Sequence, residues 1–473
     1  MVHSKLIFFV MCLFSVTLNS QIELPAFFGN NMVLQQNENV SIWGKDIPRT
    51  LIKISSSWGS KTSVVSDSKG FWFSTIQTSQ GSFEKHTLRI EGSNTVVLTN
   101  VLIGEVWLCS GQSNMEMPLK GFHKSKVLNA NKYLEISNNK NIRLFNNPRT
   151  ASVSPNFSVK GNWEESNLES AKSFSAIGYI FGTKLFENLC VPIGIIESSW
   201  GGTKIESWMP KESLLKYKYI KIPSSLSKEQ NKQKQPTFLY NAMIHPFQDF
   251  KIKGILWYQG ESNRLQPSTY KNYMKDLIAS WRKQWKDENL PFYFVQIAPF
   301  NYVKNKNASL LGADLIREAQ LKVFQETNNT ALVVTTDAGD CNDIHPPKKE
   351  IIAKRLANWA LTKQYNFKNL NYRSAEFKSM SVKNSQIHLI FNFYNKDFFK
   401  ESNDVKGFSI AGTNKIFYPA QLKFNKDKKS IILYSEKVNE PVSVRYGFEE
   451  CFESNLKTKS GLPISVFRTD NWK

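Results

Sequence analysis

Between about residues 101 and 365, apolar runs with strand character alternate with longer segments that have the period of an amphipathic helix. The expected strands are Glu105–Cys109, Pro192–Glu197, Gly254–Gln259, Phe292–Ala298 and Ala331–Asp337. In the expected helix Ser268–Lys286, aromatic and aliphatic side chains recur at three- and four-residue spacing, and a second helix runs from Lys349 to about Tyr365. This alternation predicts an α/β fold, a parallel sheet with helices on both faces.

The segments on either side have a different pattern, in which short β-rich runs are separated by turn residues. Residues 21–100 contain runs such as VSIWG and FWFSTIQT, and residues 371–473 contain SIILYSE and PVSVRYGF. Short strands at this spacing are typical of a small β-sandwich. We therefore expect an N-terminal sandwich-like domain at 21–100, an α/β domain at 101–370 and a C-terminal β-rich region at 371–473.

The first 20 residues, MVHSKLIFFVMCLFSVTLNS, contain one lysine, then an apolar run, then small and polar residues. This is the pattern of a signal peptide, and the apolar run is too short to span a bilayer comfortably. We expect a mature chain that starts near Gln21 and is exported to the periplasm or the extracellular space. No later apolar stretch of the sequence is long enough for a membrane span.

Four cysteines would remain after cleavage: Cys109, Cys190, Cys341 and Cys451. An oxidising compartment permits a disulfide between them, but their spacing assigns no pair and fits no zinc pattern. Cys109 and Cys190 lie in apolar, strand-like runs, so we expect both to be buried thiols. The formal net charge is +21, yet the lysines are spread along the chain without a nucleic-acid-binding motif, so we expect no nucleic-acid partner.

Polar and glycine-rich segments follow four of the expected strands. They are Gly111-Gln112-Ser113-Asn114, Ser199-Trp200-Gly201-Gly202, Gln259-Gly260-Glu261-Ser262-Asn263 and the stretch from Asp337 to His345. The carboxyl ends of parallel strands meet at one edge of a sheet, which is where sites form in such folds. A serine nucleophile needs a base and a set of donors for the oxyanion, and Ser113, His345 and the Gln259 amide supply these types of group. Taken singly, each segment is equally well explained as a turn or a capped loop.

The last of these segments also has the residue types of a metal site. Asp337, Asp340, Asp343 and His345 lie within nine positions of one another. Their spacing does not match the EF-hand loop, and no second histidine is near. We therefore expect no metal and no cofactor.

Four motifs in this order carry a resemblance: GQSNM, SSWGGTKIESW, WYQGESN and DIHPPKK. Together they resemble the sialate O-acetylesterase family within the SGNH-hydrolase group. FGNNMVLQQ and IWG near the N-terminus, and NLKTKSGLPISVFRTDNW at the C-terminus, are also similar to the flanking β regions of that family. The resemblance implies a flavodoxin-like, three-layer hydrolase core at 101–370 that removes O-acetyl groups from sugars.

Carried over by position, the resemblance implies that Ser113 is the nucleophile and His345 the general base. The wider group has Asp three residues before the histidine, where this chain has Asn342. The group that orients His345 is then Asp343, Asn342 or a backbone carbonyl, and we take Asp343 as the candidate.

The family's oxyanion donors match the Ser113 N–H, a glycine of the pair Gly201-Gly202, and Gln259. Asn263 is the alternative to Gln259. Further candidates for substrate binding are Gln112, Asn114, Trp200, Glu261 and Asn263, whereas Glu206 and Trp208 fit an acceptor site or the core equally well.

The expected function is that of a serine esterase acting on an O-acetylated sugar, most directly O-acetylated sialic acid, through an acetyl-Ser113 intermediate. An esterase for acetylated xylan or another plant polysaccharide is the first alternative, since the motifs specify the reaction better than the sugar. A non-catalytic glycan-binding protein is the second alternative. The sequence gives no indication of an oligomeric state.

Overall fold

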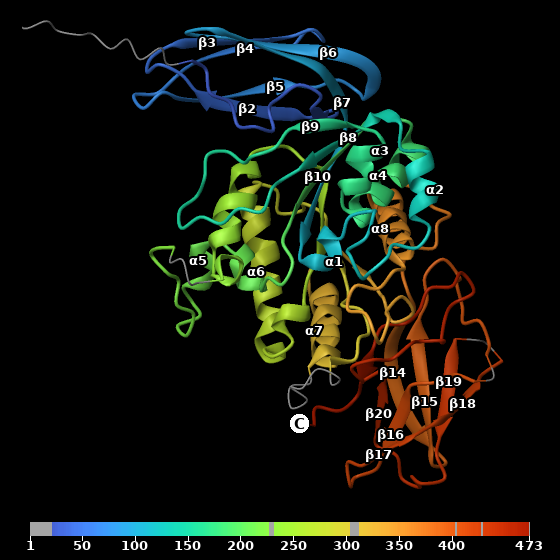
Figure 1. Ribbon diagram of the computed structural model, residues 1–473. Helices are drawn as coiled ribbons and strands as arrows, with labels where there is room; N and C mark the ends of the chain where they lie inside the picture. Colours follow the sequence, from blue (N-terminus) through green and yellow to red (C-terminus); the bar gives the residue numbers. More distant parts are fainter. Residues whose placement is uncertain (1–20, 227–230, 303–311, 403, 427–428, 473) are drawn as a thin grey trace, which may run out of the picture.

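The computed structural model describes residues 21–226, 231–302, 312–402, 404–426 and 429–472. The expected signal peptide, residues 1–20, lies outside the described residues. Figure 1 shows three parts in a row, with β-sheets of the N-terminal part at one end, an α/β part in the middle and β-sheets of the C-terminal part at the other end. Within the described ranges, no helix is long and apolar enough to cross a membrane.

The middle part has a mixed α/β fold built on a central sheet with strand order β13-β12-β11-β7-β10-β8-β9. The strands are β7 (Thr95–Gly111), β8 (Asn139–Asn146), β9 (Trp163–Ser166), β10 (Ile193–Ser199), β11 (Gly254–Tyr258), β12 (Phe292–Val295) and β13 (Thr330–Val333). Neighbouring strands are parallel except for β9, which pairs antiparallel with β8 at the edge. The expected parallel sheet is confirmed, with one antiparallel edge strand added.

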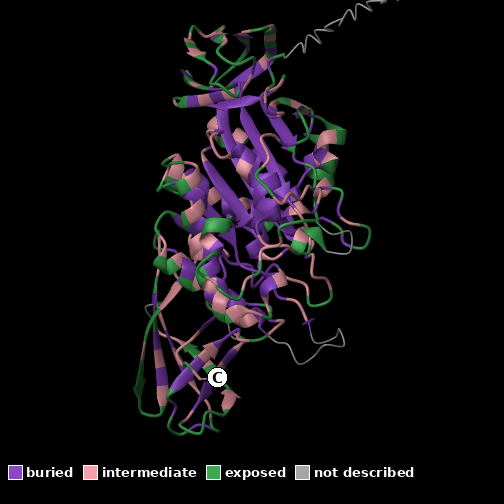
Figure 2. Ribbon diagram, turned by 90° about the vertical axis from the view of Figure 1, so that its left-hand side faces the viewer, coloured by how far each residue is buried: buried purple, intermediate pink, exposed green. Residues whose placement is uncertain are grey.

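Helices cover both faces of this sheet. The longer ones are α4 (Ala176–Leu189), α6 (Pro267–Gln284), α7 (Ala313–Glu326) and α8 (Lys349–Gln364). In β11, Ile255 and Trp257 pack in the same core as α6 and α7, whereas Leu256 and Tyr258 pack in the core of α4 and α8. Successive side chains of a strand point to opposite faces, so both faces of the sheet are apolar, and Figure 2 shows the central strands buried.

Shorter helical segments connect these elements. They are α1 (Ser113–Glu116), α2 (Ala130–Glu135), α3 (Leu168–Ser173), α5 (Lys211–Leu214), the 3-10 turns η1 (Ile205–Trp208), η2 (Lys232–Lys234), η4 (His245–Phe247) and η5 (Glu261–Asn263), and the π-turn η3 (Tyr240–Ile244).

Strand β7 belongs to two parts of the protein. Its first residues pair antiparallel with β6 (Ser82–Glu91), its middle pairs parallel with β1 (Val33–Gln35), and its last residues lie between β10 and β11. The expected domain boundary at residue 100 falls inside this strand. One continuous backbone therefore connects the N-terminal sheet to Ser113, which starts the helix directly after the strand.

The two flanking parts are each built from two sheets. In the N-terminal part, β2 (Asn39–Lys45) pairs with β5 (Phe71–Gln77), and β3 (Leu51–Ser56), β4 (Lys61–Val65), β6 and β7 form the other sheet. The C-terminal sheets are β14-β15-β19-β18 and β17-β16-β20-β21. These strands are β14 (Glu376–Lys383), β15 (Gln386–Asn392), β16 (Phe408–Ala411), β17 (Phe417–Pro419), β18 (Gln421–Phe424), β19 (Ser430–Tyr434), β20 (Ser443–Tyr446) and β21 (Phe467–Arg468).

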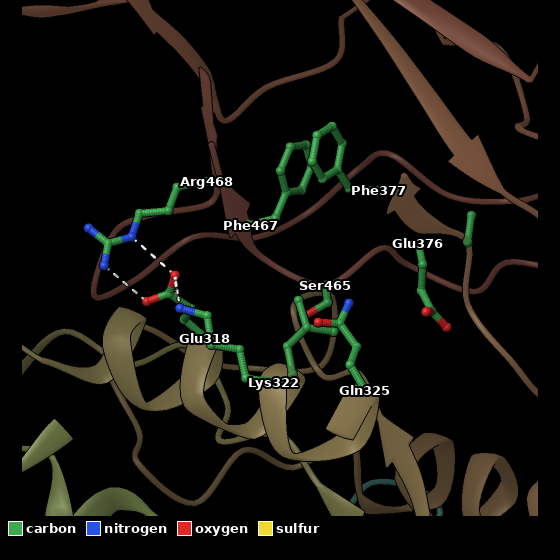
Figure 3. A pocket seen from close by; sticks show the side chains of 10 residues that line it. Glu318, Lys322, Gln325, Glu376, Phe377, Ser465, Phe467 and Arg468 are labelled. Carbon is green, nitrogen blue, oxygen red and sulfur yellow. Dashed lines mark hydrogen bonds and ion pairs between the residues drawn. The ribbon is translucent and has the colours of Figure 1, made fainter. Parts of the chain in front are cut away.

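The C-terminal part packs on helix α7. The Arg468 guanidinium donates through Nε and Nη2 to the two carboxylate oxygens of Glu318, each at 3.1 Å, beside a cavity of about 110 Å³ (Figure 3). A paired geometry of this kind fixes orientation as well as distance. The C-terminal part is thereby held against the α/β part.

The cysteines differ from expectation at one position. Cys341 and Cys451 form a disulfide, with Cα atoms 5.6 Å apart. Cys109 is a buried free thiol, as expected, but Cys190 is exposed. The prediction of a buried Cys190 was wrong because this residue follows helix α4 as its left-handed cap, with φ of 53°, and does not belong to strand β10.

Candidate active site

The loops that follow β7, β10 and β11 meet at the carboxyl edge of the central sheet. β7 lies between β10 and β11, so the strands that follow it in the chain are placed on both of its sides. Such a switch point is where ligands bind in open α/β sheets. The backbone N–H of Gln112 donates to the carbonyl of Tyr258 at 2.9 Å, and that of Trp200 to the carbonyl of Gly111 at 3.1 Å. The three loops are thus fixed to one another next to Ser113.

Ser113 is the first residue of helix α1, and Gln112 is its extended N-cap. The N–H groups at the start of a helix have no intrahelical acceptor, so the Ser113 N–H is free to face a ligand. Within the described ranges the half-buried Ser113 hydroxyl has no hydrogen-bond partner. A Cβ added to Gly201 would lie 3.1 Å from Ser113 Cβ, so the backbone of the β10 loop packs directly against the serine.

His345 lies in the loop before helix α8, and its ring packs edge-on against Phe122 with centroids 5.1 Å apart. Its Nδ1 is 3.8 Å from Oδ1 of Asp343, which is too long for a hydrogen bond. The same oxygen instead accepts the backbone N–H of His345 at 2.8 Å. Asp343 therefore shapes the loop, and its expected role of orienting the ring through a hydrogen bond is not seen. Burial and the charge of Lys349 lower the pKa of His345, although Asp343 opposes this.

A buried network joins the segments of Ser113 and His345. Asn114 Nδ2 donates to Glu261 Oε1 at 2.7 Å and to the carbonyl of Ile344 at 3.0 Å, and Lys349 Nζ donates to Asn114 Oδ1 at 2.5 Å. Asn114 and Glu261 were expected to bind substrate, whereas here both are buried and hydrogen-bonded within this network. Burial lowers the pKa of Lys349 to about 7 and raises the pKa of Glu261.

Gln259 and Asn263 form a second buried network, and both are fully inaccessible. Gln259 Nε2 donates to the carbonyl of Thr203 at 3.1 Å and to Asn263 Oδ1 at 2.8 Å, and its Oε1 accepts from Tyr270. Asn263 Oδ1 also accepts the Ile205 N–H, and its Nδ2 donates to the Glu206 carboxylate. The expected donation by Gln259 or Asn263 to an oxyanion is not seen here, because both amide groups are buried and engaged with protein partners. They bind the β10 loop to the β11 loop instead.

The Gly201 N–H is also occupied. It donates to Glu116 Oε2 at 2.9 Å, and Glu116 Oε1 in turn pairs with Arg149 Nε. The neighbouring Gly202 is exposed and has a φ of 71°, where glycine is favoured, and its N–H has no partner in the described part of the chain. Of the expected glycine pair, Gly202 is therefore the donor that is free.

The remaining candidates lie around the same edge. Gln112 is 3% exposed, and its Oε1 is 3.4–3.5 Å from the N–H groups of Gly260 and Ser262. Trp200 is half-buried and packs against the core, whereas Trp208 is buried in it.

A pocket of about 260 Å³ opens beside the loops of Ser113 and His345. Its lining includes Glu116, Lys120, Phe122, Arg149 and Glu197. Phe122 connects the pocket to the His345 ring, and Glu116 connects it to Gly201.

Several of these residues were missed from the sequence. Glu116 lies three positions after Ser113 in the GQSNMEM motif, and this spacing was a signal that it shares the site. Arg149 and Phe122 lie in loops without a motif. Among the described residues, no group of three His, Cys, Asp or Glu side chains is arranged to hold a metal ion.

Comparison with known proteins identifies the family. Residues 103–361 match the family described as "Carbohydrate esterase, sialic acid-specific acetylesterase". This range is more than half of the chain and includes all four strand-end loops. The chain belongs to this family. The resemblance carried by its four motifs is therefore confirmed.

Relatives of this sialic acid-specific acetylesterase family match well beyond the central part. The sialate O-acetylesterase of Pongo abelii is 31% identical, with 73% of this chain and 72% of the relative covered. That of Mus musculus is 28% identical, with 82% and 81% covered. A solved carbohydrate acetylesterase from Xanthomonas citri is 33% identical and superimposes with a TM-score of 0.86 over 96% of this chain and 100% of the other. The likeness thus includes both flanking β parts, and the protein is a carbohydrate esterase.

Proposed function

We propose that this carbohydrate esterase removes O-acetyl groups from sialic acid, with Ser113 as nucleophile and His345 as general base. The observation that carries the proposal is the family match over residues 103–361, because it includes the loops of Ser113, Gly201, Gln259 and His345. The names of the relatives, sialate O-acetylesterases of mammals, support the same substrate class.

The proposed mechanism uses an acetyl-enzyme. His345 accepts the hydroxyl proton of Ser113, and Ser113 Oγ attacks the acetyl carbonyl carbon. The tetrahedral intermediate collapses, and the sugar oxygen leaves with the proton from His345. His345 then takes a proton from water, whose oxygen attacks the acetyl-Ser113 carbonyl, and acetate leaves as Ser113 regains its proton. The lowered pKa of His345 supports this role because the ring is then neutral, and able to accept a proton, at pH 7.

The oxyanion needs donors that are free, and two backbone groups meet this requirement. We assign the N–H groups of Ser113 and Gly202, which have no partner within the described ranges. No hydrogen bond joins the Ser113 hydroxyl to the His345 ring among the described contacts. Catalytic hydrogen bonds are often long without substrate and tighten when it binds, so the proposed roles do not require this contact beforehand.

The strand order supports an SGNH-type core. With the strands β8 and β9 at one edge left aside, β7, β10, β11, β12 and β13, numbered in chain order, are arranged as 2-1-3-4-5, which is the flavodoxin-like order. We also propose that the chain is exported with residues 1–20 as its signal peptide. The Cys341–Cys451 disulfide supports this, because such bonds persist mainly in oxidising compartments.

The test is acetate release by the purified chain from residue 21 onward, with O-acetylated sialic acid and acetylated xylan compared at equal concentration. We expect preference for the sialic acid and no release by Ser113→Ala. The Xanthomonas citri neighbour is described only as a carbohydrate acetylesterase, which keeps xylan as the second candidate. Preference for xylan would retain the mechanism and replace the substrate. Release from neither sugar would favour a glycan-binding protein.

A further inference from the structure

The pocket beside the Ser113 loop contains a half-exposed arginine whose binding capacity is only partly used. Arg149 is 54% exposed, and its Nε pairs with Glu116 Oε1. In the described part of the chain its terminal nitrogens Nη1 and Nη2 have no partner. A guanidinium presents five N–H groups in a planar fork, and the Nη1–Nη2 edge can receive a carboxylate with two parallel hydrogen bonds. Arg149 therefore has a vacant carboxylate-binding edge in the lining of the pocket.

Arg149 is close to the reacting groups through a short chain of contacts. Glu116 bridges it to the Gly201 N–H, and Gly201 packs against Ser113. Phe122, which contacts the His345 ring, lines the same pocket. The contacts from Arg149 through Glu116 and Gly201 therefore place the arginine near Ser113.

The charged groups that line the pocket are balanced in sign. Its cations are Arg149 and Lys120, and its carboxylates are Glu116 and Glu197. The Glu116 carboxylate already forms an ion pair with the Arg149 guanidinium. Burial raises the pKa of Glu197 well above its usual value, against the opposing effect of hydrogen bonds from Ser199. A substrate carboxylate on the open edge of Arg149 thus meets a site that is not negative overall.

We propose that Arg149 binds the carboxylate of the substrate, and that this contact makes the esterase prefer an acidic O-acetylated sugar over a neutral one. This inference rests on the proposed function, because it specifies how the same site selects sialic acid. In this arrangement Glu116 holds the Arg149 guanidinium in the orientation that leaves the Nη1–Nη2 edge open. Arg149 is a specificity residue and takes no proton in the reaction.

The test compares O-acetylated sialic acid with its carboxyl methyl ester, with acetate release as the readout. Hydrolysis of the methyl ester group releases methanol, so acetate reports only on the O-acetyl reaction. For the wild type we expect kcat/KM for the free acid to exceed that for the ester. Arg149→Gln should lower kcat/KM for the free acid by about tenfold, mainly through KM, and leave the value for the ester within about twofold; tenfold corresponds to about 1.4 kcal/mol.

Two matched variants separate the proposal from simpler explanations. Arg149→Lys keeps the charge but not the fork, so it should recover only part of the preference. Lys120→Gln removes the other cation of the pocket and should change the preference less than Arg149→Gln does. A loss by Arg149→Gln that is equal for acid and ester would overturn the proposal, because Arg149 would then act only through Glu116. A larger effect of Lys120→Gln would also overturn it.

The carboxyl methyl ester of the O-acetylated sialic acid also serves as the folding control, since a variant that still releases acetate from it is folded. A wild type that releases acetate from neither sialic acid substrate, yet does so from acetylated xylan, would refute the proposed function itself. That result is visible before any variant is made, so the two failures are distinguishable.

Discussion

The disulfide beside the proposed base allows a prediction in which the loss of stability can be calculated from the structure. Cys341 lies four positions before His345, and Cys451 belongs to the C-terminal part, so the bond anchors the His345 loop from outside the α/β part. Cys451→Ser removes this anchor and leaves the loop residues unchanged. We expect lower thermal stability and a lower kcat, because the loop of His345 then keeps only non-covalent contacts, such as the hydrogen bond from Asn114 to Ile344 and the ion pair of Lys348 with Glu453.

The magnitude comes from the length of the closed loop. The two cysteines are separated by 110 residues, for which the chain-entropy relation gives about 4.8 kcal/mol at 25 °C. An unfolding entropy of about 2.1 cal/mol/K per residue, over about 450 residues, converts this into a fall in Tm of about 5 °C. A displacement of His345 from Ser113 by a fraction of a hydrogen-bond length should lower kcat by about tenfold.

The assay is thermal unfolding and acetate release, each with and without a thiol reductant. Reductant should shift the wild type to the Tm and kcat of Cys451→Ser and should have no further effect on the variant. Cys190→Ser, which changes an exposed free thiol, is the matched control and should behave as the wild type. If Cys451→Ser melts within about 1 °C of the wild type, or if reductant still lowers the Tm of the variant, the reasoning is refuted.

Three further predictions concern the site itself. Gln259→Leu should lower the unfolding free energy by about 1–3 kcal/mol for each buried group left unpaired, seen as a lower urea midpoint; loss of kcat at unchanged stability would contradict its structural role. Gly201→Ala places a methyl group 3.1 Å from Ser113 Cβ, so kcat should fall at least tenfold in an assay of acetate release, and unchanged kcat would show that the loop is free to move. Lys349→Met removes a charge that lowers the pKa of His345. With neutral His345 as the proposed base, activity is lost as pH falls through its pKa, so the acid limb of kcat/KM should move to higher pH; a limb that stays in place would exclude His345 as the titrating group.

The secondary structure of the α/β part was predictable because each element has a strong local pattern. The helix expected at Ser268–Lys286 is α6 (Pro267–Gln284), and the strand expected at Gly254–Gln259 is β11 (Gly254–Tyr258). β7 is the exception, since Glu105–Cys109 was expected as a strand of its own, whereas it belongs to a strand that begins at Thr95. Over residues 95–100, exposed residues alternate with half-buried or buried ones, which is the pattern of a strand that belongs to the N-terminal part and not to the central sheet.

The roles of the polar residues were less predictable, because they depend on partners distant in the sequence. Asn114 and Lys349 are 235 positions apart, and the sequence does not indicate that the asparagine faces the lysine and not the substrate. Gln259 has a donor amide of the right type for an oxyanion hole, but this amide is taken by Thr203 and Asn263. Residue type and strand-end position locate such a site; only the contacts decide which of its members are free.

The continuity of β7 has a consequence for how this protein can be divided or recombined. At about 3.3 Å per residue, its 17 residues extend over about 56 Å, from the edge of the N-terminal sheet to the nucleophile. A recombination experiment with its crossover at residue 100 would build β7 from two different parent sequences, although both parts of the protein depend on this one strand. The N-terminal sheet is therefore inherited together with Ser113, the proposed nucleophile, as a single unit. Viable chimaeras of related esterases should have their crossovers before Val33, where β1 begins.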